Sequence, residues 1–562
     1  MDTDNSIIEG ISHITEEVIE TALNVNQLSH TRKQITYESI MLLNELLGMN
    51  NRIDKNIGII YKNLHEFILG MSDNIKGFRQ NGDHFNNIIL NINDIKNRFH
   101  ETSKVIMELI DIVEEIKIYT DEIYILATNA AIESSKYHSI SPVFEILSDR
   151  LNTLSIFINE NLEHIIEIVE PISNGIDNLI QINTLVLNDI QKGHQSFTNF
   201  SKQLEDQEHV INELIMKAYM SGSKIDDQKK MLEDINGKII QMDKDALQAI
   251  NGSSNVMNIG KGIKDSINFL IDGIGNGRRK DEFLNKINFI EEQSSTIWHT
   301  AQNVNEKSRS QLEFSYSSLE FCDSIIQESK EMEKTITIFN KESIESNELT
   351  TGVTSVLGDM SAQLKEIEKR ITDSNKTLNR FTGDFHKINN IVDILQKILK
   401  MMKIIGIYSR IESARNPQEF KGFITISDSI QQLQNNIKQT LPRIQENINK
   451  TKQTIDMVDN YFKNITFVFY KIRESSTFII KNLEEISTIS SNDEKISKII
   501  LEDSLNLDTL LNDLRSYLVK LTDVVKQPIE GSAANIKRGK DIEEKSIMLK
   551  KQLESDNSHV DL

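Results

Sequence analysis

The sequence contains few of the residues that interrupt helices or form tight loops. Its 562 residues include 23 glycines and 5 prolines, 28 in all, or about 5 per cent, whereas an average domain carries roughly 12 per cent. Because ordinary domains need such residues at their many turns, this scarcity excludes a series of compact domains with the usual density of loops. We expect a chain made mostly of long helices.

Cysteine, positive charge and long apolar runs are also scarce. The only cysteine, Cys322, has no internal disulfide partner, which is consistent with a reducing compartment. A formal net charge of −21 argues against binding to nucleic acid or to anionic lipid. No apolar run approaches the ~18 to 20 residues of a membrane span, and the N-terminal "MDTDNSIIEG" is unlike a signal peptide. We expect a cytoplasmic protein with no nucleic-acid partner and no membrane insertion.

The residue patterns typical of catalysis and metal binding are missing as well. The sequence has no glycine-rich phosphate loop after a strand and no His-Glu-x-x-His, and its 12 histidines are scattered. Paired carboxylates such as Glu16-Glu17 are typical of a solvated helix face. We therefore expect no enzyme activity, no cofactor and no metal.

Heptad periodicity is what the sequence does contain. Between residues 92 and 127, alternating steps of three and four collect eleven positions, of which nine are apolar. They are Ile92, Ile95, Phe99, Thr102, Ile106, Leu109, Val113, Ile116, Thr120, Ile123 and Ala127. Five heptads in one register predict the seam of a coiled coil or a long helical bundle.

The chain also repeats itself at an offset of 279 residues, without a gap. The matched positions are Ile125, Ile132, Glu133, Ser134, Phe144, Ser148, Asp149 and Leu154 with Ile404, Ile411, Glu412, Ser413, Phe423, Ser427, Asp428 and Leu433. A distant pair, "INGSSNVMNIGK" from Ile250 and "IEGSAANIKRGK" from Ile529, shares the same offset. Such agreement between distant segments indicates a tandem duplication.

Each copy is predicted to be an antiparallel helical hairpin. The first spans residues 1–250 with its tip near 134–143, and the second spans 283–530 with its tip near 413–422. Pro142 and Pro417 mark the two reversals, while Pro171 and Pro442 should kink or end the returning helices. The glycine-rich segment 251–282 is predicted to be the crossover, and 531–562 a polar tail. The expected fold is all-α, with two hairpins forming a four-helix-bundle rod within one chain.

The two tips resemble the signalling tip of bacterial methyl-accepting chemotaxis proteins. Residues 129–133, "NAAIE", match the family pattern outright, and Lys136, Phe144 and Asp149 follow at its spacing. The second tip fits the same frame through Glu412, Arg415, Phe423 and Asp428.

This resemblance implies a cytoplasmic signalling scaffold that docks the chemotaxis coupling adaptor and histidine kinase through its tips. It also implies self-association through the tips, or association with other chemoreceptors, helped by Glu133 with Lys136 and by Glu412 with Arg415. The implied partner-binding residues are Ile125, Asn129, Ala130, Ala131, Ile132, Glu133, Lys136, Phe144, Asp149, Glu412, Arg415, Phe423 and Asp428.

Departures from the family pattern keep a second interpretation open. The second tip has Tyr408-Ser409-Arg410 in place of Asn-Ala-Ala, so we expect binding to depend on the first tip. No Glu/Gln pair framed by small residues occurs, and reversible methylation is not expected. The alternative is a structural coiled-coil spacer or filament component, derived from a chemoreceptor, that lacks kinase coupling.

Overall fold

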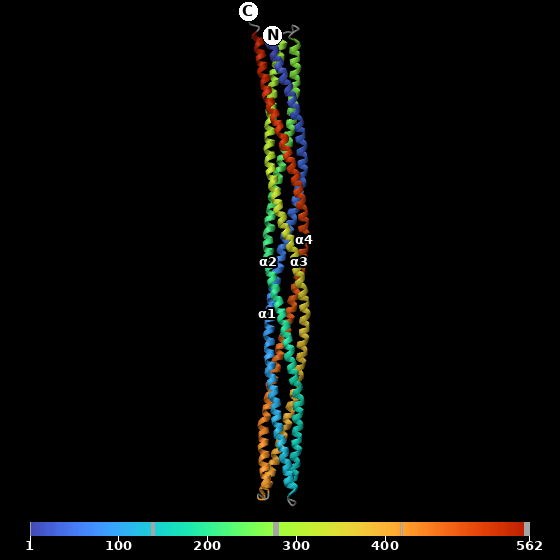
Figure 1. The fold of residues 1–562 in the computed structure, drawn as a ribbon, viewed down its shortest axis with the longest axis vertical. Coiled ribbons are helices and arrows are strands. Elements are labelled where there is room, and N and C mark those ends of the chain that lie inside the picture. The colour runs from blue at the N-terminus through green and yellow to red at the C-terminus, as the bar shows by residue number, and fades with distance from the viewer. Residues whose placement is uncertain (1, 137–140, 274–279, 416–417, 419, 556–562) are drawn as a thin grey trace, which may run out of the picture. The chain divides into compact units, whose positions relative to one another are not determined.

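The computed structural model of the chain describes residues 2–136, 141–273, 280–415, 418 and 420–555. They form four long helices, drawn from blue to red in Figure 1. The helices are α1 (Asp2–Ser134), α2 (Ser141–Gly273), α3 (Lys280–Arg415) and α4 (Lys421–Ser555). No strand occurs within these described ranges. The protein is all-α, as its heptads predict.

The predicted heptad seam is the buried face of α1. All eleven positions from Ile92 to Ala127 are at most 3% exposed, including Thr102 and Thr120. Thr120 donates its hydroxyl to the backbone oxygen of Ile116 at 2.9 Å, so its polar group is satisfied within the helix. One continuous apolar stripe of α1 is therefore removed from water. Burial of such a stripe is the main contribution to the stability of a long helix.

The chain folds into two compact units, and each unit contains a segment of every helix. Unit 1 comprises Met1–Ile68, His209–Asn347 and Thr488–Leu562, and unit 2 comprises Leu69–Glu208 and Glu348–Ser487. The units thus cut across the two predicted hairpins, because helices of both hairpins share each core.

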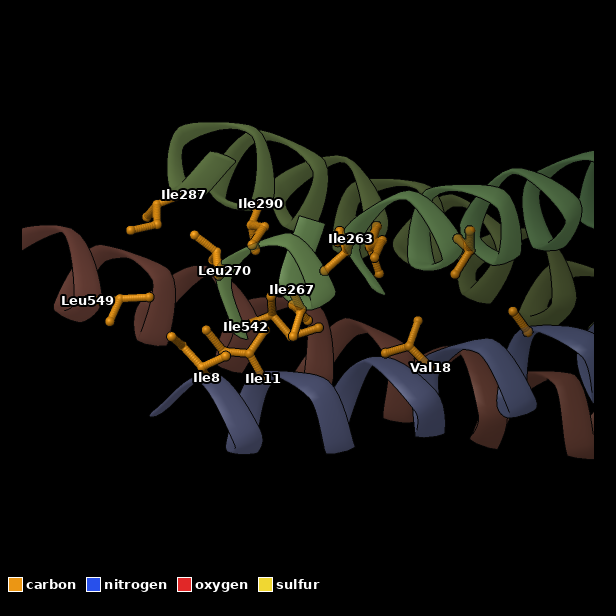
Figure 2. Packing of buried hydrophobic residues seen from close by; sticks show 13 residues of the cluster. Ile8, Ile11, Val18, Ile263, Ile267, Leu270, Ile287, Ile290, Ile542 and Leu549 are labelled. Atoms are coloured by element: carbon orange, nitrogen blue, oxygen red, sulfur yellow. The ribbon is translucent and has the colours of Figure 1, made fainter. Parts of the chain in front are cut away.

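In unit 1, one core cluster draws apolar side chains from all four helices. Figure 2 shows part of it, with Ile8 of α1, Ile263 of α2, Ile287 of α3 and Ile542 of α4. In unit 2, polar pairs link each helix to two others: Arg79–Glu205, Arg370–Asp189, Asn375–Asp459 and Arg443–Glu115. Each unit is therefore a four-helix bundle.

The glycine-rich segment is helical over most of its length, which corrects the predicted crossover of 251–282. α2 continues to Gly273 and α3 begins at Lys280, while residues 274–279 lie outside the described ranges. A Cβ on Gly260 would lie 2.6 Å from Cγ1 of Ile19, and one on Gly252 would lie 2.7 Å from Cγ2 of Val304. These glycines are needed where a neighbouring helix packs too closely for a side chain.

The predicted polar tail is also mostly helix. α4 runs through residues 531–555, and residues 556–562 lie outside the described ranges. Its glycines repeat the close packing of α2: a Cβ on Gly531 would lie 2.8 Å from Cγ2 of Val25, and one on Gly539 would lie 3.0 Å from the Trp298 side chain. Through these contacts the C-terminal segment packs against α1 and α3 as part of the bundle. The prediction of a separate tail is therefore wrong for residues 531–555.

The prolines within the returning helices do not end them. Pro171 lies inside α2 and Pro442 inside α4, and both side chains face solvent. Each removes one backbone donor, but the helix on either side remains packed in its bundle. The sequence predicts that each proline kinks or ends its helix, and of these two outcomes an end to the helix is wrong. Pro142 occupies the second position of α2, where a proline is tolerated, and Pro417 lies outside the described residues.

Hydrogen bonds between helices recur at the offset of 279 residues. Asn26 donates from Nδ2 to the backbone oxygen of Ile250 at 2.9 Å, and Asn305 makes the equivalent bond to Ile529 at 2.7 Å. Two further equivalent pairs are Ser155–Thr120 with Gln434–Leu399, and Asn50–Ile225 with Ser329–Ser504. The duplication seen in the sequence is thus reflected in the structure: within each unit, contacts made by the first copy recur at the equivalent residues of the second.

One pair of equivalent contacts in unit 1 has exchanged its charges. Arg52 of α1 bonds to Asp503 of α4, with Nη2 and Oδ1 3.0 Å apart. At the equivalent positions, Glu331 of α3 pairs with Lys224 of α2. Both bases belong to the first copy, Arg52 on its outgoing helix and Lys224 on its returning helix, and both acids belong to the second copy. The two copies have therefore diverged in a compensated way.

A buried arginine breaks the near-twofold repetition in the core of unit 1. Arg32 donates from Nη1 to Oε1 of its own equivalent, Gln311, at 2.6 Å, and to Oγ of Ser308 at 3.1 Å. Burial lowers its pKa to about 10, against the opposing effect of Asp245. The guanidinium therefore remains charged at neutral pH, surrounded by hydroxyl and amide partners that offset part of its desolvation.

A buried carboxyl group should make unit 1 more stable at low pH. Asp493 of α4 is 3% exposed and accepts a hydrogen bond from Nδ2 of Asn63 at 2.6 Å. Burial raises its pKa from 3.8 to about 7, although the Asn63 hydrogen bond acts in the opposite direction. The stabilising contribution of the protonated form is complete below pH ~4 and is lost as the pH rises through ~7.

We expect Asp493→Asn to remove this pH dependence. Above pH 8 the variant should be more stable than the parent by up to about 4 kcal/mol, since each pKa unit corresponds to ~1.4 kcal/mol. Urea unfolding between pH 4 and 8 measures the difference, with exposed Glu502→Gln as the control. Parallel pH profiles for the parent and Asp493→Asn would show that Asp493 does not titrate in this range.

Candidate functional site

The ends of the two hairpins pack against each other in unit 2. The rings of Phe144 and Phe423 stack with centroids 3.9 Å apart and planes at 27°. The ring centroid of Phe420 lies 5.1 Å from that of Phe144, and Ala130 is the fourth buried residue of the cluster. Leu147 and Ile426 pack against its margin. The first tip region (residues 118–136 and 141–157) and the second (397–415 and 420–436) therefore share one apolar core.

The small residues that end α1 satisfy its last carbonyl groups. Ser134 donates its hydroxyl to the backbone oxygen of Ala131 at 2.8 Å, and Ser135 donates to that of Ile132 at 2.7 Å. The Ser135 amide also donates to Ala131 at 3.2 Å. Because the final carbonyls of a helix lack intrahelical partners, these serines stabilise the end of α1 before residues 137–140, which lie outside the described ranges.

A charged pair recurs at both tip regions. Nζ of Lys136 lies 2.8 Å from Oε2 of Glu133, and Nη1 of Arg415 lies 2.7 Å from Oε2 of Glu412. Glu133 also reaches the other hairpin, because a Cβ on Gly422 would lie 3.6 Å from its Cγ. The bases are mostly exposed, so the pairs add little stability and leave charge on the surface.

The predicted partner-binding residues divide into an inner and an outer group. Ala130, Phe144 and Phe423 are buried in the shared core, so their side chains are not on the surface of the tip regions. Their side chains instead hold the hairpin ends together. Exposed residues are Ile125, Asn129, Ile132, Lys136, Asp149, Arg415 and Asp428, whereas Ala131, Glu133 and Glu412 are partly buried.

An exposed apolar stripe runs along α1 on the outer side of the first tip region. Ile118, Ile125 and Ile132 are 59%, 57% and 55% exposed and follow one another at intervals of seven residues. Ile146 of α2 is exposed to a similar degree. Ile118 was not predicted, although its seven-residue spacing from Ile125 was a usable signal. Large apolar side chains that are exposed at regular intervals along one helix are typical of a docking surface.

The second tip region has a different outer face. Ile404 and Ile411 occupy the positions equivalent to Ile125 and Ile132 and are also exposed. Beside them, Tyr408 is exposed, and Nη1 of Arg410 lies 3.6 Å from Oδ1 of Asp428. The isoleucine pattern is retained, but a bulky ring and an ion pair now flank it.

Neither tip region contains a recognisable catalytic arrangement. Across the part of the chain that the structure describes, no group of three His, Cys, Asp or Glu side chains is placed to hold a metal ion. The thiol of Cys322 is buried in unit 1, and burial raises its pKa to about 12. It is therefore a poor nucleophile near neutral pH. In the described residues, no helix is long and apolar enough to cross a membrane.

No protein-family model matches the sequence, and no solved structure is a significant match to the fold. The resemblance to chemoreceptor tips therefore rests on the residues described above and on their spacing.

The contact between the tip regions can be tested by a disulfide. We expect Glu133→Cys combined with Gly422→Cys to cross-link within one chain in dilute oxidising solution, because the two side chains would start from adjacent positions. Non-reducing electrophoresis and intact mass measure the product, with each single variant as a control. Buried Cys322 should not compete. Exclusively dimeric products would contradict packing of the two tip regions within a chain.

The aromatic stack should determine how often the hairpin ends open. Phe144→Ala removes a buried ring, a change that typically costs about 3 to 5 kcal/mol. We expect amide hydrogen exchange in peptides covering residues 120–134 and 421–430 to accelerate by roughly a hundredfold or more. Ile146→Ala, an exposed site two residues away, should change exchange by less than about threefold. Equal acceleration by both variants would show that the stack has no special role.

Proposed function

We propose that the chain is a cytoplasmic chemoreceptor-like signalling scaffold that docks the chemotaxis coupling adaptor and histidine kinase through its first tip region. The observation that carries the proposal is the stripe of Ile118, Ile125 and Ile132 beside the motif Asn129–Glu133. A scaffold of this kind has no catalytic activity of its own and needs no cofactor.

The stripe supports docking because its side chains are exposed and take no part in the core. The apolar interior of the tip regions is already filled by Phe144, Phe420 and Phe423, so the outward isoleucines add nothing to it. Fully burying one such side chain contributes about 1.5 to 3 kcal/mol. A partner that covers the stripe would gain this contribution at several positions along one helix face.

Polar residues around the stripe would provide specificity. Asn129 and Asp149 are exposed at the same tip region, and Glu133 presents a carboxylate paired with Lys136. Hydrogen bonds and charges at the rim of an apolar contact select the partner more than they add affinity. Self-association of tips, or association with other receptors, would use the same surface.

The first tip region is the better candidate for docking. Ala131 presents a methyl group where its equivalent, Arg410, extends a guanidinium toward Asp428. The small side chain allows a partner helix to approach the backbone closely, whereas the ion pair at the second tip region occupies that space.

A structural spacer remains the competing function. It is favoured by the altered second tip region, where Tyr408 and Arg410 replace small residues. A spacer needs the buried seam but has no use for exposed isoleucines at regular intervals. Co-sedimentation with purified adaptor and kinase distinguishes the two functions, because a spacer would leave both proteins in the supernatant.

Equivalent substitutions in the two tip regions test which one docks. Ile125→Ser should reduce adaptor binding by roughly five- to a hundredfold, and Ile404→Ser should change it little, although both side chains are exposed to a similar degree. Ala131→Arg should weaken binding over the same range, because it overfills a close contact. Arg410→Ala should leave it unchanged or strengthen it.

Circular dichroism must show that each variant keeps its helices, which is expected because Ile125, Ile404 and Arg410 are exposed and Ala131 is only partly buried. If Ala131→Arg leaves adaptor binding intact while Arg410→Ala abolishes it, the docking region is the second one and the assignment above is wrong. If no variant matters because the parent binds neither adaptor nor kinase, the spacer interpretation replaces the proposal.

A further inference from the structure

A groove lies between α1 and α2 in unit 1, remote in sequence from both tip regions. It has a volume of about 410 Å³, within the range of small-molecule sites. Its lining consists of Asp54, Ile57, Gly58, Tyr61, Ala218, Tyr219, Gly222, Ser223 and Asp226. Apolar and aromatic surface is thus combined with two carboxylates.

Small residues create the hollow. An added Cβ on Gly58 would meet no atom within 4 Å, and one on Gly222 would meet only Cγ2 of Ile57, at 4.0 Å. Ala218 lies one turn before Gly222 on α2 and is buried at the floor. No neighbouring helix packs into the space that these residues leave, unlike the space beside Gly252 or Gly260. Close helix packing therefore does not explain them.

The duplicated copy provides an internal comparison. At the offset of 279, Thr337 replaces Gly58, Leu501 replaces Gly222 and Leu505 replaces Asp226. The alignment is fixed locally by the charge-exchanged ion pairs, Arg52–Asp503 and Glu331–Lys224, which lie within a few residues of these positions. Hence one copy carries larger side chains where the other leaves the groove open.

The chemistry of the lining points to an organic cation. Tyr61 and Tyr219 have ring centroids 6.4 Å apart, and His65 packs edge-on against Tyr61 at 4.7 Å. Aromatic faces attract cations and apolar groups alike. Asp54 and Asp226 line the same groove, and neither makes an ion pair or side-chain hydrogen bond within the described residues.

Within the described residues no lysine forms an ion pair with either carboxylate, although Lys230 also interacts electrostatically with Asp226. Lys62 pairs with Glu66 at 3.5 Å, Lys230 pairs with Asp227 at 3.0 Å, and Lys224 pairs with Glu331. A metal ion would leave the tyrosines unused, and the described residues offer no third metal-binding side chain there. The net charge of −21 would also raise the local concentration of cations.

We infer that this groove binds a small organic cation with an apolar or aromatic body. The ammonium group lies between Asp54 and Asp226, and the body of the ligand lies against Tyr61 and Tyr219 over the floor formed by Ala218 and Gly222. The inference is independent of adaptor docking, because none of these residues belongs to the tip regions.

Calorimetric titration of the full chain with 2-phenylethylammonium tests the inference. We expect one site per chain and at least tenfold weaker binding of 2-phenylethanol, which keeps the ring but has no charge. Asp54→Asn with Asp226→Asn should weaken binding of the ammonium at least tenfold. Glu333→Gln, at the position equivalent to Asp54 in the second copy, is the matched control and should change it less than twofold.

Gly222→Leu introduces the residue of the second copy and should abolish binding by filling the groove. Leucine is also the better helix former, so circular dichroism should show an intact protein. Equal affinity for the ammonium and the alcohol would overturn the inference, as would undiminished binding by Gly222→Leu or an equal loss in Glu333→Gln. A lysine-rich peptide that binds at least tenfold more tightly than 2-phenylethylammonium would overturn the assignment to a small molecule.

Discussion

Burial of one apolar stripe along each helix is the interaction on which the rest of the structure depends. A helix of this length is not stable through its backbone hydrogen bonds alone, so its persistence requires partners along its face. The seam from Ile92 to Ala127 is fully covered. The same requirement explains why Gly260 and Gly531 occur where neighbouring side chains press against the backbone, and why Pro171 and Pro442 face solvent.

Because both copies lie in one chain, equivalent positions of this bundle can carry different residues, which is impossible in a bundle of two identical chains. In a homodimer every substitution appears twice, whereas here each copy changes alone. Hydrogen bonds such as Asn26–Ile250 and Asn305–Ile529 are kept in both copies, because a buried polar group without a partner is costly. Surface features have diverged, as the exchanged charges of Arg52–Asp503 and Glu331–Lys224 illustrate, and so has the buried pair of equivalent positions Arg32 and Gln311.

The tip regions separate the task of holding the fold from the task of recognition. Phe144 of α2 and Phe423 of α4 are buried and join the hairpin ends, while Ile125 and Ile132 of α1 are exposed. Because the buried and the exposed sets are separate residues, the outer surface can change without loss of the inner core. At the Tyr61–Tyr219 groove in unit 1 the copies differ both at outer positions, such as Gly222 and Leu501, and at the buried floor, where Ser497 is the equivalent of Ala218.

The sequence by itself determined the all-α class, the heptad seam and the tandem repeat, since each of these is a regular spacing of residues along the chain. Only the tertiary structure decided that Phe144 and Phe423 are buried, that Gly252 and Gly531 lie within helices, and that the groove beside Gly222 is open. Each of these depends on what a neighbouring helix places opposite the residue. Periodicity specifies which face of a helix is buried, but the distance between two faces is set by side chains hundreds of residues apart.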